Sequence, residues 1–235
     1  IDSNLVGFGN LLECCRNIDI KHLLYASSSS VYGGNTKLPF SEKDNVDNPV
    51  SLYAATKKAN ELMAHSYSHI YRIPSTGLRF FTVYGPWGRP DMAPMIFTKA
   101  ILSSKAIKVF NNGEMWRDFT FVDDAVKAIY KLINKPPLEQ TDDFTNNITG
   151  KIGVPYRVVN IGNSKSIKLI DFIKVIEDEL KIESKKIFQE MQLGDVKKTY
   201  ADTNYLKQLI KYEPNTSLKV GIKKFIQWYL DFYKF

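Results

Sequence analysis

The sequence has few cysteines, no glycine-rich phosphate loop and no long apolar run. Among 235 residues the only cysteines are Cys14 and Cys15. They are neighbours on a predicted helix, which argues against an ordinary disulfide clamp and favours a reducing, cytoplasmic compartment. Neither a G-x-G-x-x-G segment after a strand nor the P-loop spacing occurs. No stretch approaches the ~20 apolar residues of a membrane span, and no segment resembles a signal peptide, so we expect no membrane partner.

The residues that are present have an ordinary globular composition with a basic balance. Hydrophobic residues make up 44% and charged residues 24%, which excludes an intrinsically disordered chain. Lys and Arg number 32 against 25 Asp and Glu, and a net charge of +7 favours anionic partners. The basic residues are scattered and no aromatic RNA-binding motif accompanies them, so we expect no nucleic-acid partner.

Hydrophobic spacing predicts alternating helices and strands. Helices are expected over 3–17, 52–70, 94–104, 122–134, 167–180, 203–210 and 217–231. Strands are expected over 21–27, 75–81, 107–110, 157–161 and 186–190, with loops over 27–49, 82–94 and 135–155. The alternation predicts an α/β fold with a largely parallel sheet.

Tyr53 and Lys57 form a candidate catalytic pair. They are four residues apart on a predicted helix, so both lie on one face. A phenol of pKa ~10 is a poor base at neutral pH, but a nearby ammonium favours its ionised form. The pair could therefore take a proton from a substrate hydroxyl. Composition alone supplies about 1.4 such pairs by chance, and a pair without context would more often be a surface contact.

The context comes from polar segments at strand ends. Four serines, Ser27 to Ser30, follow directly on the strand at 21–27 and precede Val31, Tyr32 and Gly33. Hydroxyls at the carboxyl end of a parallel strand lie where open α/β sheets bind ligands, although such a run can also be a plain polar turn. A second segment, 79–86, leaves the next strand, and a third, 116–124, contains Arg117 and Asp118.

Together these segments resemble the extended short-chain dehydrogenase/reductases that act on nucleotide sugars. The resemblance is strongest to UDP-glucuronate 4-epimerases of bacterial polysaccharide synthesis. It is carried by the serine-rich strand end with Val31-Tyr32-Gly33, the Tyr53/Lys57 pair, the loop from Phe80 to Pro90, Arg117-Asp118, and the stretch from Gln192 to Val196. It spans nearly the whole chain, and the order and spacing of five segments make it specific.

The resemblance implies catalytic and cofactor roles for four residues. Tyr53 is the implied base, and Lys57 is its pKa-lowering partner and a contact of the NAD ribose. Ser28 is implied to hydrogen-bond the 4-hydroxyl of the sugar, and Phe80 to line the nicotinamide. In the implied reaction Tyr53 removes the hydroxyl proton while hydride passes from C4 to NAD, and both return after the 4-keto sugar has turned over.

The resemblance also implies where the UDP-sugar binds. Thr82 and Arg89 are implied beside the sugar and its carboxylate, Arg117 on the diphosphate, and Asp195 on the uridine ribose. Arg suits a diphosphate because its planar fork offers paired donors. The full set of implied substrate-binding residues is Ser29, Ser30, Thr82, Arg89, Lys108, Phe110, Arg117, Gln192 and Asp195. No metal site is expected, because His65 and His69 lack the H-E-x-x-H pattern and a third ligand.

Two departures keep other functions open. Ser29 and Ser30 stand where related 4,6-dehydratases have Asp and Glu, which disfavours elimination and decarboxylation. The likeness begins at a helix before the family's fourth strand, so we expect an N-terminally truncated chain. The open alternatives are another nucleotide-sugar enzyme (a UDP-glucose 4-epimerase or a dehydratase) and a catalytically incompetent fragment or half of a split enzyme.

The implied fold is a partial Rossmann-like parallel sheet, without the N-terminal strands and their Gly-rich NAD loop, plus a smaller C-terminal α/β substrate domain. Residues 1–90, rejoined by segments from about 107–165, are expected to be the remainder of the NAD-binding domain. Residues 91–235 are expected to be mainly the interleaved nucleotide-sugar domain. Expected partners are a UDP-sugar and either a second copy of the chain or a separate N-terminal half; NAD is the expected cofactor, although its binding to this chain alone is doubtful.

Overall fold

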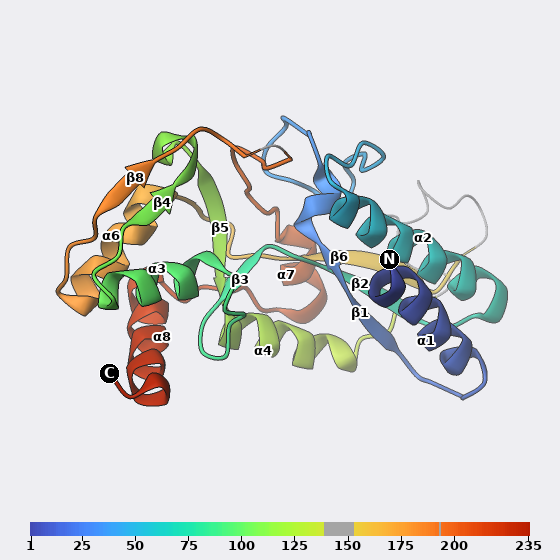
Figure 1. Ribbon diagram of the computed structural model, residues 1–235. Helices are drawn as coiled ribbons and strands as arrows, with labels where there is room; N and C mark the ends of the chain where they lie inside the picture. The colour runs from blue at the N-terminus through green and yellow to red at the C-terminus, as the bar shows by residue number, and fades with distance from the viewer. Residues whose placement is uncertain (139–152, 193) are drawn as a thin grey trace. The chain divides into compact units, whose positions relative to one another are not determined.

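A computed structural model describes residues 1–138, 153–192 and 194–235 (Figure 1). Residues 139–152 of the loop predicted over 135–155 lie outside the described residues, as does Leu193. The chain divides into two compact units whose segments alternate along the sequence. Unit 1 comprises Ile1–Phe80, Ala128–Ile161 and Asp202–Tyr212, and unit 2 comprises Phe81–Lys127, Gly162–Ala201 and Glu213–Phe235.

Unit 1 is built on a three-stranded parallel sheet. Its strand order is β1 (Leu23–Ser28), β2 (Ser75–Phe80) and β6 (Tyr156–Ile161). The register pairs Ser28 with Phe80 and Phe80 with Ile161, so the three carboxyl ends are level. All-parallel strands of this kind are predicted by short apolar runs, because both faces of the sheet are covered.

Among its described residues, unit 1 also contains three whole helices, two short helical turns and the last part of α4 (Val122–Ile133). The turns are η1 (Asp2–Val6) and η2 (Ser29–Tyr32), and the helices are α1 (Gly7–Arg16), α2 (Leu52–Tyr71) and α7 (Asn204–Ile210). α1 and α2 lie side by side (Figure 1) and bury one apolar cluster with β1. That cluster consists of Leu12, Cys15, Leu23, Tyr25, Ala64 and Ile73.

The described part of unit 2 holds two smaller sheets. β3 (Thr82–Tyr84) pairs in parallel with β5 (Trp116–Phe121), and β5 pairs antiparallel with β7 (Ser166–Lys168). β4 (Ile107–Val109) pairs in parallel with β8 (Lys186–Phe188). The helical elements are α3 (Ala93–Leu102), η3 (Phe110–Gly113), α6 (Leu169–Leu180) and α8 (Leu218–Tyr233), and the boundary between the units falls inside α4 (Val122–Ile133).

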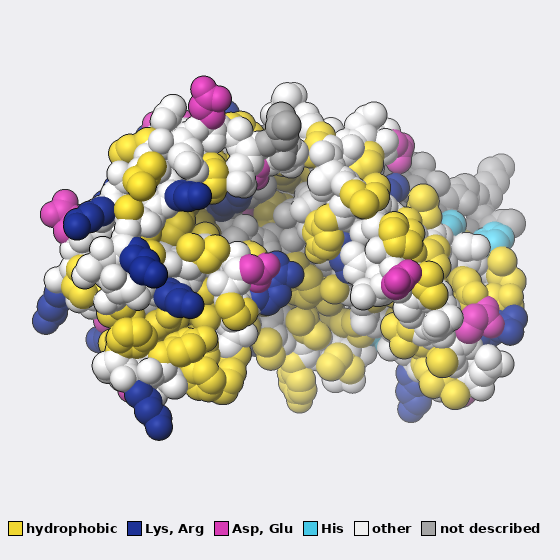
Figure 2. Space-filling model, in the orientation of Figure 1, with side chains coloured by type: hydrophobic (Ala, Val, Ile, Leu, Met, Phe, Trp, Pro, Cys, Tyr) yellow, Lys and Arg dark blue, Asp and Glu magenta, His cyan; other side chains and the backbone are white. Residues whose placement is uncertain are grey.

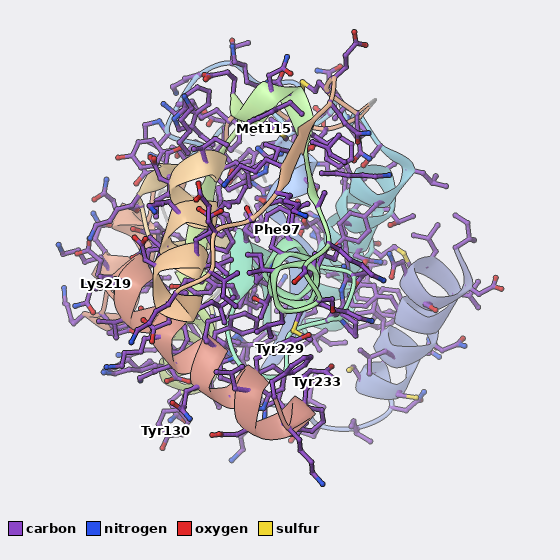
Figure 3. All side chains as sticks on the ribbon, turned by 60° about the vertical axis from the view of Figure 1, so that its left-hand side comes forward. Phe97, Met115, Tyr130, Lys219, Tyr229 and Tyr233 are labelled. Atoms are coloured by element: carbon purple, nitrogen blue, oxygen red, sulfur yellow. The ribbon has the colours of Figure 1, made fainter. Side chains whose placement is uncertain are left out.

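The core of unit 2 is rich in aromatic rings. Phe119 stacks on Phe172 with ring centroids 4.0 Å apart, and burying each such ring stabilises the fold by about 2 kcal/mol. Figure 3 shows Phe97, Met115 and Tyr229, which belong to this core. Tyr229 is buried, whereas Tyr233 one turn later on α8 is exposed. At the aromatic end of α8, therefore, some rings are buried in the core and others are exposed.

Helix and strand predictions hold where the periodicity is long. The predicted helices at 3–17, 52–70, 94–104, 122–134, 167–180, 203–210 and 217–231 are confirmed, as are the five predicted strands. β3 was not predicted, because it lies in the Gly/Pro-rich segment assigned to the loop over 82–94. β7 was not predicted, because it overlaps the start of the helix expected over 167–180. β5 was not predicted because Arg117 and Asp118 interrupt its apolar pattern.

The described residues show neither of two features that would indicate a particular class of protein, a membrane-spanning helix and a metal site. None of their helices combines the length and the apolarity that a membrane crossing needs. Within the same residues, His65 and His69 included, no three His, Cys, Asp or Glu side chains gather as a metal site. Cys14 and Cys15 are both free thiols. Basic side chains are spread over the face that Figure 2 shows.

Candidate functional site

Tyr53 and Lys57 lie on the first two turns of α2. The helix begins after Ser51, whose hydroxyl accepts a hydrogen bond from the Ala54 N–H at 3.1 Å. Tyr53 is 49% exposed, and the Lys57 ammonium donates to the carbonyl of Ala26 at 3.1 Å. Burial lowers the pKa of Lys57 from its ordinary value. The structure thus fixes Lys57 against β1 and leaves the Tyr53 phenol accessible.

The serine segment begins where β1 ends. Ser27 and Ser28 are buried, and Ser29 and Ser30 are half-buried on η2. The Ser28 hydroxyl caps η2 by accepting a hydrogen bond from the Ser30 N–H at 3.1 Å. Its own proton is not used in that bond. Phe80 lies beside Ser28 in the strand register, so unit 1 brings Ser28 and Phe80 together at the carboxyl end of the sheet.

In unit 2 the structure pairs Arg117 with Asp195. The Arg117 guanidinium donates to the carboxylate at 2.6 Å and to the carbonyl of Trp116 at 2.9 Å. Burial lowers the pKa of Arg117, while the Asp195 carboxylate opposes that shift. Gln192, which is exposed, accepts the Asp195 N–H through its backbone carbonyl at 3.3 Å. Arg117, Gln192 and Asp195 thus gather at one place.

Asp118, the residue after Arg117, anchors this part of β5. It is fully buried, and its carboxylate accepts N–H groups from Asn163 at 2.8 Å and from Ala201 at 3.1 Å. Burial raises the pKa of Asp118 to about 6, although these hydrogen bonds act in the opposite direction. One carboxylate therefore fixes three separate segments around Arg117.

The remaining sequence-predicted residues of unit 2 are dispersed over several elements. Thr82 lies on β3, next to β5 in the same sheet. Arg89 lies in the loop after β3, where its side chain is 73% exposed and pairs with Asp91 at 3.2 Å. Lys108 is exposed on β4, and Phe110 begins η3. Lys108 and Phe110 thus belong to the other sheet and its adjoining turn.

Comparison with known proteins places the chain in a family. Residues 1–149 match the NAD dependent epimerase/dehydratase family. The chain belongs to this family. It is 54% identical over 235 residues to Protein CapI of Staphylococcus aureus, covering all of this chain and 70% of that protein. It is 44% identical over 236 residues to the probable UDP-glucuronate 4-epimerase of Rhizobium meliloti (strain 1021). That match covers 100% of this chain and 69% of the relative.

A solved structure extends the similarity to three dimensions. The UDP-glucuronic acid 4-epimerase of Bacillus cereus, crystallised with UDP-glucuronic acid and NAD, is 31% identical to this chain with a TM-score of 0.84. The alignment covers 99% of this chain and 68% of that one. The expected α/β, Rossmann-like fold class is confirmed, and membership of the family makes the chain an NAD-dependent enzyme of the epimerase class.

The residues of unit 1 fit the cofactor of this family. Lys57 borders an open groove of about 380 Å³ along β1 and α1, to which Ser3, Asn4 and Asn60 add hydroxyl and amide groups. Ammonium, amide and hydroxyl groups are suitable partners for ribose hydroxyls.

Sequence reasoning assigned no role to Glu61 and Arg79, which form a buried ion pair beneath the serine segment. Arg79 Nη2 lies 2.8 Å from Glu61 Oε2, and each side chain is only 4% exposed. The sequence does contain an indication that these two residues are paired. Arg79 lies inside an otherwise apolar strand, and a buried charge requires a partner. Glu61 follows Lys57 by four residues, on the same face of α2.

Proposed function

We propose that the chain inverts C4 of a UDP-uronic acid, interconverting UDP-glucuronate and UDP-galacturonate with NAD as cofactor. The observation that carries the proposal is the placement of Lys57 against the serine-ended strand. Its ammonium reaches Ala26, two residues before Ser28, with Tyr53 one turn earlier on the same helix. The 44% identity to a probable UDP-glucuronate 4-epimerase supports the choice of sugar.

The chemistry assigned to unit 1 is a reversible proton transfer. The Tyr53 oxygen takes the proton of the 4-hydroxyl and later returns it, and Lys57 lies one turn later on the same helix. The free proton of Ser28 is suited to hold the 4-oxygen in place. NAD, when bound, supplies a reversible hydride acceptor for C4. Because proton and hydride both return, the reaction has no net redox change.

The serine segment argues against the related elimination reactions. Loss of water or of carbon dioxide from a 4-keto sugar is assisted by a carboxylic acid or carboxylate close to the ring. Ser28, Ser29 and Ser30 offer only hydroxyls at the end of β1, and a hydroxyl is a weak acid and base at neutral pH. We therefore assign epimerisation rather than dehydration.

Arg89 is the residue we assign to the choice of a uronic acid. Its guanidinium is exposed, pairs with Asp91, itself 70% exposed, and donates to the sulfur of Met92 at 3.4 Å. Exposed ion pairs are worth about 1 kcal/mol or less, so a substrate carboxylate can replace Asp91 at little cost. A bidentate Arg–carboxylate contact would then favour UDP-glucuronate over UDP-glucose.

Product analysis tests the proposal. The chain is incubated with NAD and either UDP-glucuronate or UDP-glucose, and the products are separated by chromatography. We expect UDP-galacturonate from the first and little product from the second. A 4-keto-6-deoxy sugar or a pentose would overturn the reaction type, UDP-galactose as the main product would overturn the sugar, and no turnover with either would support the non-catalytic alternative.

The role of Arg89 is tested by comparing two variants on the two substrates. Arg89→Ala is expected to lower kcat/KM for UDP-glucuronate by about 10- to 100-fold, the loss of a charge-assisted contact, and to spare UDP-glucose. Lys105→Ala, which removes an exposed cation from the turn after α3, serves as the matched control. Equal losses for the two substrates would show that Arg89 does not contact the carboxylate.

A further inference from the structure

We infer that the Glu61–Arg79 ion pair positions the serine segment and the catalytic helix relative to each other. Glu61 and Arg79 are positioning residues: they act through Ser27, Tyr32 and α2 rather than on substrate. The inference rests on the proposed function, because it takes Tyr53, Lys57 and Ser28 as the catalytic group.

The ion pair has the geometry of a rigid clamp. Arg79 Nε and Nη2 each donate to a different carboxylate oxygen of Glu61, both at 2.8 Å. Glu61 comes from α2 and Arg79 from β2. Two parallel hydrogen bonds fix orientation as well as distance. The pair therefore sets how the helix sits on the sheet.

The same two side chains hold both ends of the serine segment. The Ser27 hydroxyl donates to Glu61 Oε1 at 2.6 Å, and Arg79 Nη1 donates to the Tyr32 oxygen at 3.1 Å. Ser27 immediately precedes residues 28–31, and Tyr32 immediately follows them. A movement of either end would break a contact with the ion pair, so the pair determines where Ser28 lies.

Tyr32 extends the clamp to the third strand. Its hydroxyl donates to Asn160 Oδ1 on β6 at 2.7 Å, and the Arg79 guanidinium lies over its ring at 4.9 Å. Asn160 in turn donates to the carbonyl of Phe40 at 2.9 Å. Burial raises the pKa of Tyr32, which keeps it a neutral phenol able to donate and accept at once. The network thus spans β1, β2, β6 and α2.

The catalytic helix is fixed at two successive turns. Lys57 contacts the carbonyl of Ala26, and Glu61, one turn later, contacts the hydroxyl of Ser27. Consecutive turns of α2 therefore bind consecutive residues of β1. A displacement of α2 would change the position of Tyr53 and Lys57 relative to Ser28, and a misplacement of about 1 Å can cost on the order of 100-fold in rate.

Stability is a weak explanation for a pair of this kind. Replacing a buried ion pair with apolar residues of similar volume is often neutral or stabilising, because desolvating two charges is costly. Removing only one partner leaves an uncompensated buried charge and is strongly destabilising. A double apolar substitution therefore separates a role in folding from a role in positioning.

The test is the double variant Glu61→Leu/Arg79→Met, assayed with UDP-glucuronate and NAD. We expect it to fold, with kcat reduced about 10- to 100-fold and KM changed by less than about threefold. Tyr71→Phe is the matched control, because it removes one hydrogen bond of the same helix, from Arg16 to the Tyr71 hydroxyl, at the far end of α2 from the catalytic pair. Its kcat should stay at the wild-type value.

Two gentler variants cover the case in which the double variant does not fold. Ser27→Ala and Tyr32→Phe each release one end of the serine segment and leave the ion pair intact. Each should lower kcat more than KM. Wild-type kcat in both of these variants, or in a folded double variant, would overturn the inference.

A readout without turnover separates this inference from the proposed function. Burial against β1 lowers the pKa of Lys57, so loosening of α2 should move that pKa back up toward its ordinary value. NMR titration of the Lys57 ammonium, assigned with Lys57→Arg, measures this in Ser27→Ala and in the double variant. If the wild type turns over no UDP-sugar, the proposed function fails alone. An unchanged Lys57 titration in these variants would then overturn the positioning role.

Discussion

The Arg117 guanidinium donates to the Asp195 carboxylate across 2.6 Å, although the two residues are 78 positions apart in the sequence. Arg117 is 17% exposed and Asp195 34%, so the pair sits at the margin of unit 2 rather than in its core. Asp118 holds the strand beneath it by accepting backbone N–H groups from two other segments. A guanidinium held in this way would present its planar fork of donors to a diphosphate, the ligand that the resemblance implies for Arg117.

We therefore predict that Arg117→Ala weakens binding of UDP by about 10- to 100-fold, because a hydrogen bond to a charged group is worth roughly 1.5–3 kcal/mol. The affinity of Arg117→Lys for UDP should lie between those of the wild type and of Arg117→Ala, since lysine keeps the charge but lacks the planar fork of donors. Calorimetric titration with UDP measures both. Lys174→Ala, which removes an exposed cation paired with Asp178 on α6, is the control. Unchanged affinity in Arg117→Ala would remove this residue from the diphosphate site.

The loss of a single oxygen tests the catalytic base. Tyr53→Phe should lower kcat by at least about 100-fold, in the range of general acid–base catalysis, while binding of UDP persists. The matched control is Tyr130→Phe on α4, because Tyr130 is 70% exposed and extends from the surface in Figure 3. Steady-state rates with UDP-glucuronate give the kcat of both variants. Near-normal turnover in Tyr53→Phe would mean that another group moves the proton.

The local part of this site could be predicted from sequence, and the long-range part could not. Tyr53 and Lys57 are four residues apart on a periodic helix, and the serines follow a short apolar strand, so local spacing alone indicates where they lie. Asp118 finds its partners 45 and 83 residues away, and no local pattern reports such contacts. β5 could not be predicted for the same reason. Its charged residues interrupt the apolar pattern, and contacts with distant parts of the chain stabilise the strand.

The loop that carries Arg89 depends on an aromatic anchor. Trp87 has a φ of 63°, rare for a bulky residue, and its ring lies 4.9 Å from Phe232 and 5.4 Å from Trp228. These contacts with α8 hold the loop in its strained conformation. We predict that Trp87→Ala raises KM for UDP-glucuronate about fivefold, the worth of an aromatic pair of roughly 1 kcal/mol, with kcat unchanged.

Trp87→Phe is the control for that prediction, because it keeps a ring against α8. Its KM should lie close to the wild-type value in the same steady-state assay. A rise in KM that is equal for the alanine and phenylalanine variants would show that the indole itself, rather than the anchoring of the loop, matters for binding.

Glu42 should make the stability of the chain depend on pH. Its carboxyl is buried, accepts the Asn160 N–H at 2.8 Å, and has its pKa raised to about 7 chiefly by desolvation. The folded state therefore binds a proton that the unfolded state releases near its ordinary value of 4.5. This contribution to stability is fully present below that value and is lost as pH rises through about 7.

Between pH 5.5 and 8 the loss attributable to Glu42 is about 2 kcal/mol. Glu42→Gln keeps an oxygen for the Asn160 N–H and removes the titration, so its free energy of unfolding should fall less over this range. Urea denaturation at several pH values measures the difference. Asp118, whose pKa is also raised by burial, keeps a smaller slope of the same sign in the variant. Asp19→Asn, at an exposed position of unit 1, should retain the wild-type profile, and an equally steep profile in Glu42→Gln would refute the assignment.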